Sequence, residues 1–334
     1  MDPLLVGVIA VVAAALLFDY TNGFHDAANA IATSVSTRAL TPRVALVMAA
    51  IGNLAGAFLG GKVAKTVGSG LVELPTGYAS LWIVFAGVMG AIGWNLLTWY
   101  FGLPSSSSHA LIGGVVGATI SVGGVVLWAS VFEKVVIPMV VSPLAGMLLG
   151  YLVMLGVMWF FRHGQPGKLN RGFRIAQSVS AAFMAVGHGM QDAAKTMGII
   201  VLALYVGGFQ SSNEHIPWWV YFTSATVLAL GTYAGGWRII RTLGRRVIHL
   251  DPPQGFAAEM TASSVLYVAA IGFGAPISTT HTITSAIMGV GATRRFSAVR
   301  WGVAGNIVTA WVLTFPMAAL IAILIHFLVA PFVG

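Results

Sequence analysis

The sequence has no cysteine and few charged residues. None of its 334 residues is Cys, 17 are Lys or Arg, and 9 are Asp or Glu. Without cysteine, disulfides, Cys-ligated zinc and thiol catalysis are excluded. Charged residues make up 8% of the chain and hydrophobic residues 57%, whereas a soluble domain carries about 25% charged residues. A water-soluble body is therefore excluded, and lipid must cover much of the surface.

Apolar runs continue along the whole chain, and a helix of about 20 apolar residues crosses a bilayer. In the first half we expect crossings at 4–36, 44–61, 80–101, 109–127 and 135–161, and in the second half at 175–207, 217–237, 255–274, 277–293 and 301–330. Some of these, notably 4–36, exceed one straight crossing, so we expect broken or re-entrant segments. The predicted fold class is an all-α polytopic membrane protein with about 10–12 transmembrane or re-entrant helices.

The basic residues give the orientation. The formal net charge is +8, but most Lys and Arg lie in short loops between apolar runs, which is typical of cytoplasmic loops and argues against a nucleic-acid partner. Residues 162–174 are predicted to form a basic cytoplasmic loop between a first repeat, 1–161, and a second repeat, 175–334. Because each repeat crosses an odd number of times, the second is inverted, and both termini are predicted outside.

The two halves share motifs as well as crossings. Residues 23–29 read Gly-Phe-His-Asp-Ala-Ala-Asn, and residues 189–195 read Gly-Met-Gln-Asp-Ala-Ala-Lys. Residues 104–109 read Pro-Ser-Ser-Ser-Ser-His, and residues 276–281 read Pro-Ile-Ser-Thr-Thr-His. The first pair is offset by 166 residues and the second by 172. Two ordered matches centred on polar residues indicate an inverted repeat, a pattern of secondary transporters whose sites lie between the repeats near the midplane.

Asp26 and Asp192 are the carboxylates at the centre of the first motif pair. A charge at this depth costs at least about 2.5–3.5 kcal/mol, so it normally faces an ion, a cavity or a partner. With Asn29 one helical turn beyond Asp26, we expect Asp26, Asn29 and Asp192 to bind a coupling ion, sodium or a proton. The second copy has Lys195 where the first has Asn29. Its ammonium either forms a neutralising salt bridge, takes the place of a coupling cation, or faces an anionic substrate.

The Ser/Thr motifs predict an anion site. Pro104 and Pro276 end the preceding helices, and hydroxyl residues open the next ones. A helix N-terminus offers unpaired N–H groups to an anion; the alternative is simple capping and packing. The candidate anion-binding residues are Ser106, Ser107, Ser108, Ser278, Thr279 and Thr280, with Lys195. Three histidines, His25, His109 and His281, are candidates for a proton relay, and packing is the alternative for each.

At these motifs the sequence resembles the inorganic phosphate transporter family, most closely its bacterial low-affinity branch. The resemblance rests on residues 23–30 and 189–195, on the two Pro-Ser/Thr-His segments, and on Trp-Asn-Leu-Leu-Thr-Trp-Tyr-Phe-Gly at 94–102. It covers nearly the full chain. The resemblance implies an all-helical, inverted-repeat carrier, a homodimer, which imports phosphate with a cation across the plasma membrane. No cofactor, resident metal or enzymatic activity is expected.

The resemblance also bears on the coupling ion. Sodium-coupled relatives carry Asn where this chain has His25 and Gln191, and Asn again in place of Lys195. Bacterial relatives with Lys there are regarded as proton symporters, and some accept neutral metal–phosphate complexes. We therefore expect proton-coupled phosphate import.

Four alternatives stay open: sodium coupling, another oxyanion such as sulfate, a passive channel, and a membrane metalloenzyme using His25, Asp26, His109 and Asp192. The enzyme is disfavoured because the chain lacks His-Glu-x-x-His and close ligand spacing.

Overall fold

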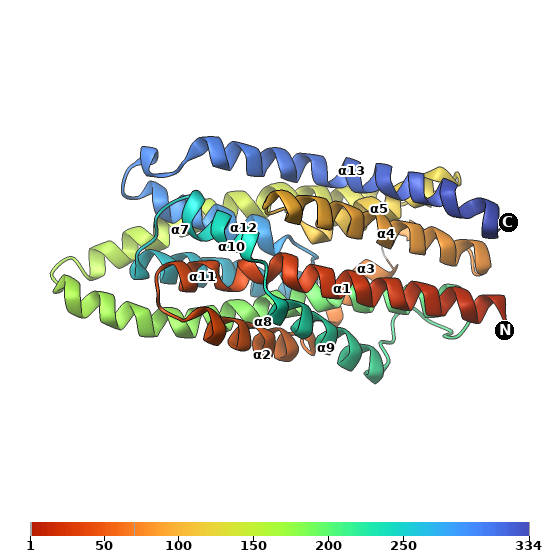
Figure 1. Ribbon diagram of the computed structural model, residues 1–334, viewed down its shortest axis with the longest axis horizontal. Coiled ribbons are helices and arrows are strands. Elements are labelled where there is room, and N and C mark those ends of the chain that lie inside the picture. The colour runs from red at the N-terminus through yellow and green to blue at the C-terminus, as the bar shows by residue number, and fades with distance from the viewer. Residues whose placement is uncertain (1, 70, 334) are drawn as a thin grey trace.

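The computed structural model describes residues 2–69 and 71–333, and this part of the chain is almost entirely helical. Within it, the only strands are β1 (Val72–Glu73) and β2 (Val125–Val126), which form one short antiparallel pair. The long helices run along the long axis of the molecule (Figure 1). The predicted all-α class is confirmed.

The two halves of the chain run through the same order of elements. The first half contains α1 (Pro3–Ser36), α2 (Pro42–Ala57), α3 (Gly61–Ser69), α4 (Tyr78–Phe101), α5 (Ser107–Ser121), α6 (Trp128–Val131), the π-helical η1 (Phe132–Val136) and α7 (Ile137–Phe160). The second half contains α8 (Pro166–Val206), α9 (Trp218–Ala234), α10 (Trp237–Arg241), η2 (Thr242–Arg246), α11 (Pro252–Tyr267), η3 (Val268–Phe273), α12 (Thr279–Ala292), η4 (Phe296–Ala298) and α13 (Trp301–Val333).

Packing between the halves is reciprocal. Helix α1 packs on α9 while α8 packs on α2, and α5 packs on α13 while α12 packs on α7. Helices α1 and α8 run in opposite directions, and α1 begins at the same end of the molecule at which α13 ends (Figure 1). The inverted repeat with both termini outside stays a prediction from the sequence.

Several predicted boundaries change. Helix α8 already begins at Pro166, so the predicted loop 162–174 is helical over most of its length. The 4–36 segment is one unbroken helix of 34 residues. By contrast, α5 has 15 residues and α12 has 14, which is less than the roughly 20 needed for a crossing. Five described helices are long and apolar enough to cross a membrane, or six if the bent α2–α3 pair counts as one span.

The short helices begin where backbone geometry dictates. Gly102 and Gly274 adopt the left-handed conformation, with φ of 66° and 60°, and end α4 and η3. Only glycine reaches this region without strain. A few residues later the hydroxyls of Ser106 and Ser278 cap α5 and α12. The N-terminal ends of α5 and α12, called their tips below, therefore follow matching turns.

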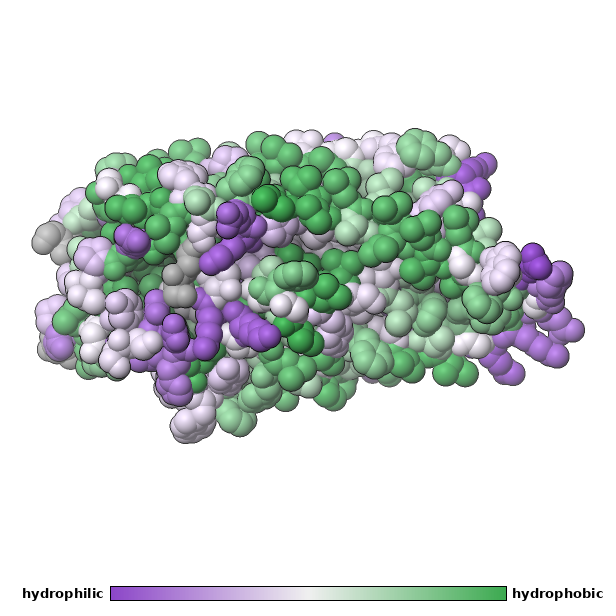
Figure 2. All heavy atoms as spheres, turned by 180° about the vertical axis from the view of Figure 1, so that it is seen from behind, coloured by the Kyte–Doolittle hydropathy of each residue, from purple (hydrophilic) through white to green (hydrophobic). Residues whose placement is uncertain are grey.

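The outer surface is apolar. Large exposed hydrophobic side chains cover α7 and α13, among them Leu144, Leu148, Phe327 and Leu328. Figure 2 shows hydrophobic residues over much of one face, with hydrophilic ones gathered in patches that include the ends. Such a surface matches the hydrocarbon core of a bilayer.

The motif glycines serve packing and not unwinding. Helices α1 and α8 stay regular through Gly23 and Gly189. A Cβ on Gly189 would lie 2.3 Å from the carbonyl oxygen of Asn53, and one on Gly23 would lie 2.6 Å from that of Leu228. Glycine therefore sets the close approach of α8 to α2 and of α1 to α9.

Gly189→Ala should destabilise the protein, because the new methyl collides with backbone that cannot move alone. Overpacking of this kind costs about 1–3 kcal/mol. Thermal unfolding in detergent measures the effect. Gly156→Ala on α7 is the matched control, since nothing lies within 4 Å of its added Cβ. Equal melting temperatures for the two variants would contradict the packing role.

Candidate functional site

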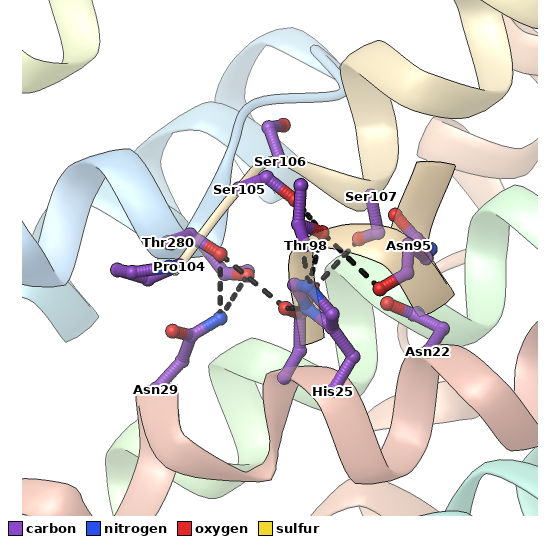
Figure 3. A network of polar contacts seen from close by, with 12 residues as sticks. Asn22, His25, Asn29, Asn95, Thr98, Pro104, Ser105, Ser106, Ser107 and Thr280 are labelled. Carbon is purple, nitrogen blue, oxygen red and sulfur yellow. Dashed lines mark hydrogen bonds and ion pairs between the residues drawn. The ribbon is translucent and has the colours of Figure 1, made fainter. Parts of the chain in front are cut away.

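The four motifs, far apart along the chain, form one cluster in space. The two Asp motifs lie in the middle of α1 and α8, and the two Ser/Thr motifs open α5 and α12. Figure 3 shows polar side chains of α1, α4 and α12 and of the start of α5 converging in the interior. Asp26, Asn29, Asp192 and Lys195 are each 0–1% exposed. The structure thus brings the predicted coupling-ion and anion-binding residues together, out of contact with solvent.

Asp26 joins both Ser/Thr motifs. Its carboxylate accepts a hydrogen bond of 2.7 Å from the Ser107 hydroxyl and one of 3.4 Å from the Thr280 hydroxyl. The Nδ1 atom of His25 lies 2.6 Å from Oδ1, the oxygen that also accepts from Thr280. Hydrogen bonds of this kind stabilise a buried carboxylate in its charged form.

Lys195 is bonded to Asp192 and to the first Ser/Thr motif at once. Its Nζ lies 2.8 Å from Asp192 Oδ1 and donates to the hydroxyls of Ser107 and Ser108 at 2.9 and 3.0 Å. The salt bridge with Asp192 is present, and the ammonium also contacts the first Ser/Thr motif, while its contact with an anionic substrate stays a prediction. Ser107 links Lys195 to Asp26, so the two Asp motifs are connected through one hydroxyl.

Asn29 takes the matching position in the other half. Its amide nitrogen donates to Thr279 at 3.1 Å and to Thr280 at 2.9 Å, and its oxygen has no partner. Asn29 on α1 thus contacts the tip of α12, as Lys195 on α8 contacts the tip of α5. The amide oxygen predicted to bind a cation is free to do so.

The six predicted hydroxyl residues divide into two roles. Ser106 and Ser278 accept the backbone N–H of His109 and His281 at 3.2 and 3.1 Å. These two serines are N-caps, so the capping alternative applies to them. The hydroxyls of Ser107, Ser108, Thr279 and Thr280 face Asp26, Lys195 and Asn29 instead.

The three histidines also divide. His25 touches Asp26, and its Nε2 lies 3.1 Å from the Thr98 hydroxyl. The rings of His109 and His281 lie 4.9 Å apart, and His281 stacks on Trp311 at 4.0 Å. Among the described residues, no hydrogen bond or ion pair joins either of these two to Asp26 or Asp192. Their surroundings favour packing, while His25 keeps the geometry of a relay.

Sequence reasoning missed other members of the cluster. The amide of Asn22 donates to Asp192 Oδ2 at 3.2 Å, and His188 Nε2 lies 3.1 Å from the same oxygen. His188 also contacts Asn53, which donates to Thr232. The signal was the i, i+4 spacing of His188 and Asp192, which places both on one helix face.

Atoms of Asp26, His188 and Asp192 lie within 4.8 Å of one another, which is the spacing of a cation site. Here the ammonium of Lys195 supplies a positive charge beside Asp192.

Another buried acid, Glu259 on α11, lies apart from this cluster. It is fully buried, although its place near the start of a crossing suggests an interfacial residue. Its carboxylate accepts from Thr33 and Ser180 at 2.5 Å each and from Gln177 at 3.3 Å. These bonds tie α11 to α1 and α8.

Comparison with known proteins gives a consistent result. The sequence model of the phosphate transporter family matches residues 22–322. A "Probable low-affinity inorganic phosphate transporter" of Rhizobium meliloti (strain 1021) is 50% identical over 97% of this chain and 96% of its own length. A protein of the same description from Bacillus subtilis (strain 168) is 42% identical over 98% of both. A solved structure described as "The sodium-dependent phosphate transporter" has a TM-score of 0.89 and covers 98% of this chain and 99% of its own, at 22% identity. At that identity the likeness concerns the fold.

Lys195→Met should destabilise the protein strongly, because it leaves Asp192 buried without its counter-ion. Removing one partner of a buried pair costs about 3–5 kcal/mol. Asp192→Asn should cost a similar amount, and the double variant should recover most of the loss. The free energy of unfolding in detergent is measured for the parent, the two single variants and the double variant. Lys168→Met, at an exposed position, is the control. Additive losses in the double variant would exclude the pairing.

Proposed function

Because this chain belongs to the phosphate transporter family, we propose that it is a secondary active transporter that imports inorganic phosphate together with a proton. The observation that carries the proposal is the contact of the Lys195 ammonium with Ser107 and Ser108 at the tip of α5. It places a fixed positive charge and hydroxyl donors at a helix N-terminus, where an oxyanion is stabilised. Since the family and the relatives consist of transporters, the metalloenzyme alternative is set aside.

Phosphate binding uses donors that the carboxylates share. In this closed arrangement Ser107 donates to Asp26, and Lys195 pairs with Asp192. An entering oxyanion competes with both carboxylates for these donors. The second tip contributes Thr279 and Thr280, which now hold the Asn29 amide. Phosphate therefore lies between the tips of α5 and α12, one from each half.

The charge balance requires a travelling cation. Moving one negative charge inward against 100 mV costs about 2.3 kcal/mol. Lys195 is part of the protein and cannot offset this charge across a transport cycle. Asp26, Asn29 and Asp192 are the proposed coupling-ion residues, and His25, in contact with Asp26, is the proposed relay. Lys195 beside Asp192 disfavours a second cation there, which supports a proton over sodium.

Further features of the proposal rest on the sequence. We place the protein in the plasma (inner) membrane as an inverted repeat, with both termini outside and the basic residues of 162–174 in the cytoplasm. It functions as a homodimer, and the alternative to carrying the phosphate anion alone is carrying it as a neutral complex with a divalent metal. Sodium remains the alternative coupling ion, supported by the free Asn29 oxygen.

In proteoliposomes, labelled phosphate should accumulate when a proton gradient is imposed, because the proton supplies the charge that the anion lacks. The measurement compares a proton gradient, a sodium gradient and neither, each with and without excess sulfate and a divalent metal. Uptake that follows sodium and ignores the proton gradient would overturn proton coupling. Strong competition by sulfate would overturn phosphate as the specific substrate.

Ser107→Ala should abolish phosphate uptake, because it removes the hydroxyl shared by Asp26 and Lys195. Ser106→Ala is the matched control one residue away. It should lower stability by about 1 kcal/mol, as loss of an N-cap does, and leave phosphate affinity close to that of the parent. Uptake rates and melting temperatures of both variants decide between the roles. A reversed pattern would place the anion at Ser106 instead.

A further inference from the structure

Asp19 on α1 is a buried acid close to the cluster, and its carboxylate has no hydrogen bond of normal geometry to the described residues. It is 0% exposed, and among residues 2–69 and 71–333 neither carboxylate oxygen has a hydrogen-bond partner of normal geometry. The other acids buried in the membrane-spanning part described above differ. Asp26 accepts from two hydroxyls, Glu259 from three side chains, and Asp192 pairs with an ammonium. An unpaired carboxylate in this setting calls for an explanation.

Asp19 belongs to the same helix face as the site. It precedes Asp26 by seven residues, or about 10 Å of helix at 1.5 Å per residue. Asn22 lies between them and donates to Asp192, while its own oxygen has no partner. Asp19 therefore lies between the cluster and the end of the molecule at which α1 begins (Figure 1). That end is the predicted outside.

The groups that face Asp19 come from α8. Asp192 and Lys195 are within electrostatic range, and the Thr196 hydroxyl lies beside the carboxylate without a hydrogen bond of normal geometry. Helices α4 and α9, which also pack on α1, contain no Asp, Glu, Lys, Arg or His and only tyrosines as titratable groups. On α1 itself, His25 and Asp26 follow.

The charged form of Asp19 is disfavoured in this arrangement. Lys195 already pairs with Asp192 and donates to two serines, so it is not free to compensate a second carboxylate. An ionised group buried without a partner costs several kcal/mol, and such a group takes up a proton instead. In the closed state Asp19 is therefore neutral.

We propose that the coupling proton binds Asp19 and not Asp26 or Asp192, whose carboxylates already have hydrogen-bond or ion-pair partners. The inference deepens the proposed proton-coupled import and rests on it. A proton from the outer side binds one Asp19 oxygen, which removes a negative charge near Lys195 and lets the anion bind. On the inner side the same O–H bond breaks and the proton leaves with phosphate. The restored carboxylate then competes for Lys195 and repels the anion, so one proton moves with each turnover.

Asp19→Asn tests the role, because the amide mimics the protonated acid. The variant should fold with a melting temperature at or above that of the parent. It should exchange phosphate across the membrane at equal concentrations without the parent's pH dependence. A proton gradient should no longer drive accumulation above equilibrium. Asp19→Glu, which titrates, should keep coupling. Glu214→Gln, an exposed carboxylate outside the helices, is the control and should behave as the parent.

An infrared difference spectrum gives an independent readout. The spectrum compares the protein before and after Asp19 loses its proton. The parent should show a band of a protonated carboxyl group that disappears, and Asp19→Asn should lack this band. Accumulation by Asp19→Asn under a proton gradient, loss of its exchange activity, or a lower melting temperature would each overturn the inference. If the parent itself shows no proton-driven uptake, the proposed function fails instead, so the two failures are distinguishable.

Discussion

The ion pair of Lys195 with Asp192, extended through Ser107 to Asp26, is the interaction on which the interior depends. It buries one ammonium and two carboxylates in a membrane protein, where each alone would be expensive. Because every member is held by another, removing one leaves a charge without compensation. The same links join α8, α5 and α1, so the site and the packing of the two halves are one structure.

The two halves solve the same contact with different chemistry. Asn29 holds the hydroxyls of the α12 tip, and Lys195 holds those of the α5 tip. A neutral amide on one side thus corresponds to an ammonium on the other. The tips also touch each other, since Ser108 donates to the carbonyl of Ile277. The two halves therefore place their tips alike, but only the contact made by Lys195 carries a positive charge.

Much of this could be predicted from the sequence because the repeat marks it. Asp26, Asp192 and the Ser/Thr motifs stand out as polar residues at matching places in apolar runs. The sequence could not show that Ser106 caps α5 while Ser107 bonds to Asp26 and Lys195. Adjacent serines are chemically the same and differ only in the direction of their side chains. The unbroken helix at Gly23 was also hidden, since glycine serves both unwinding and close packing.

Asp19 and Glu259 show that the sequence does not predict which buried acids have hydrogen-bond donors around them. Both are lone acids in apolar sequence without a counterpart in the other half, yet one has three hydrogen-bonding partners and the other none. Those partners come from helices distant in sequence, Gln177 being 82 residues from Glu259. Both acids are fully buried, so they differ in the donors around each carboxylate and not in their burial. A carboxylate surrounded by donors is a structural link, whereas one without them is suited to gain and lose a proton.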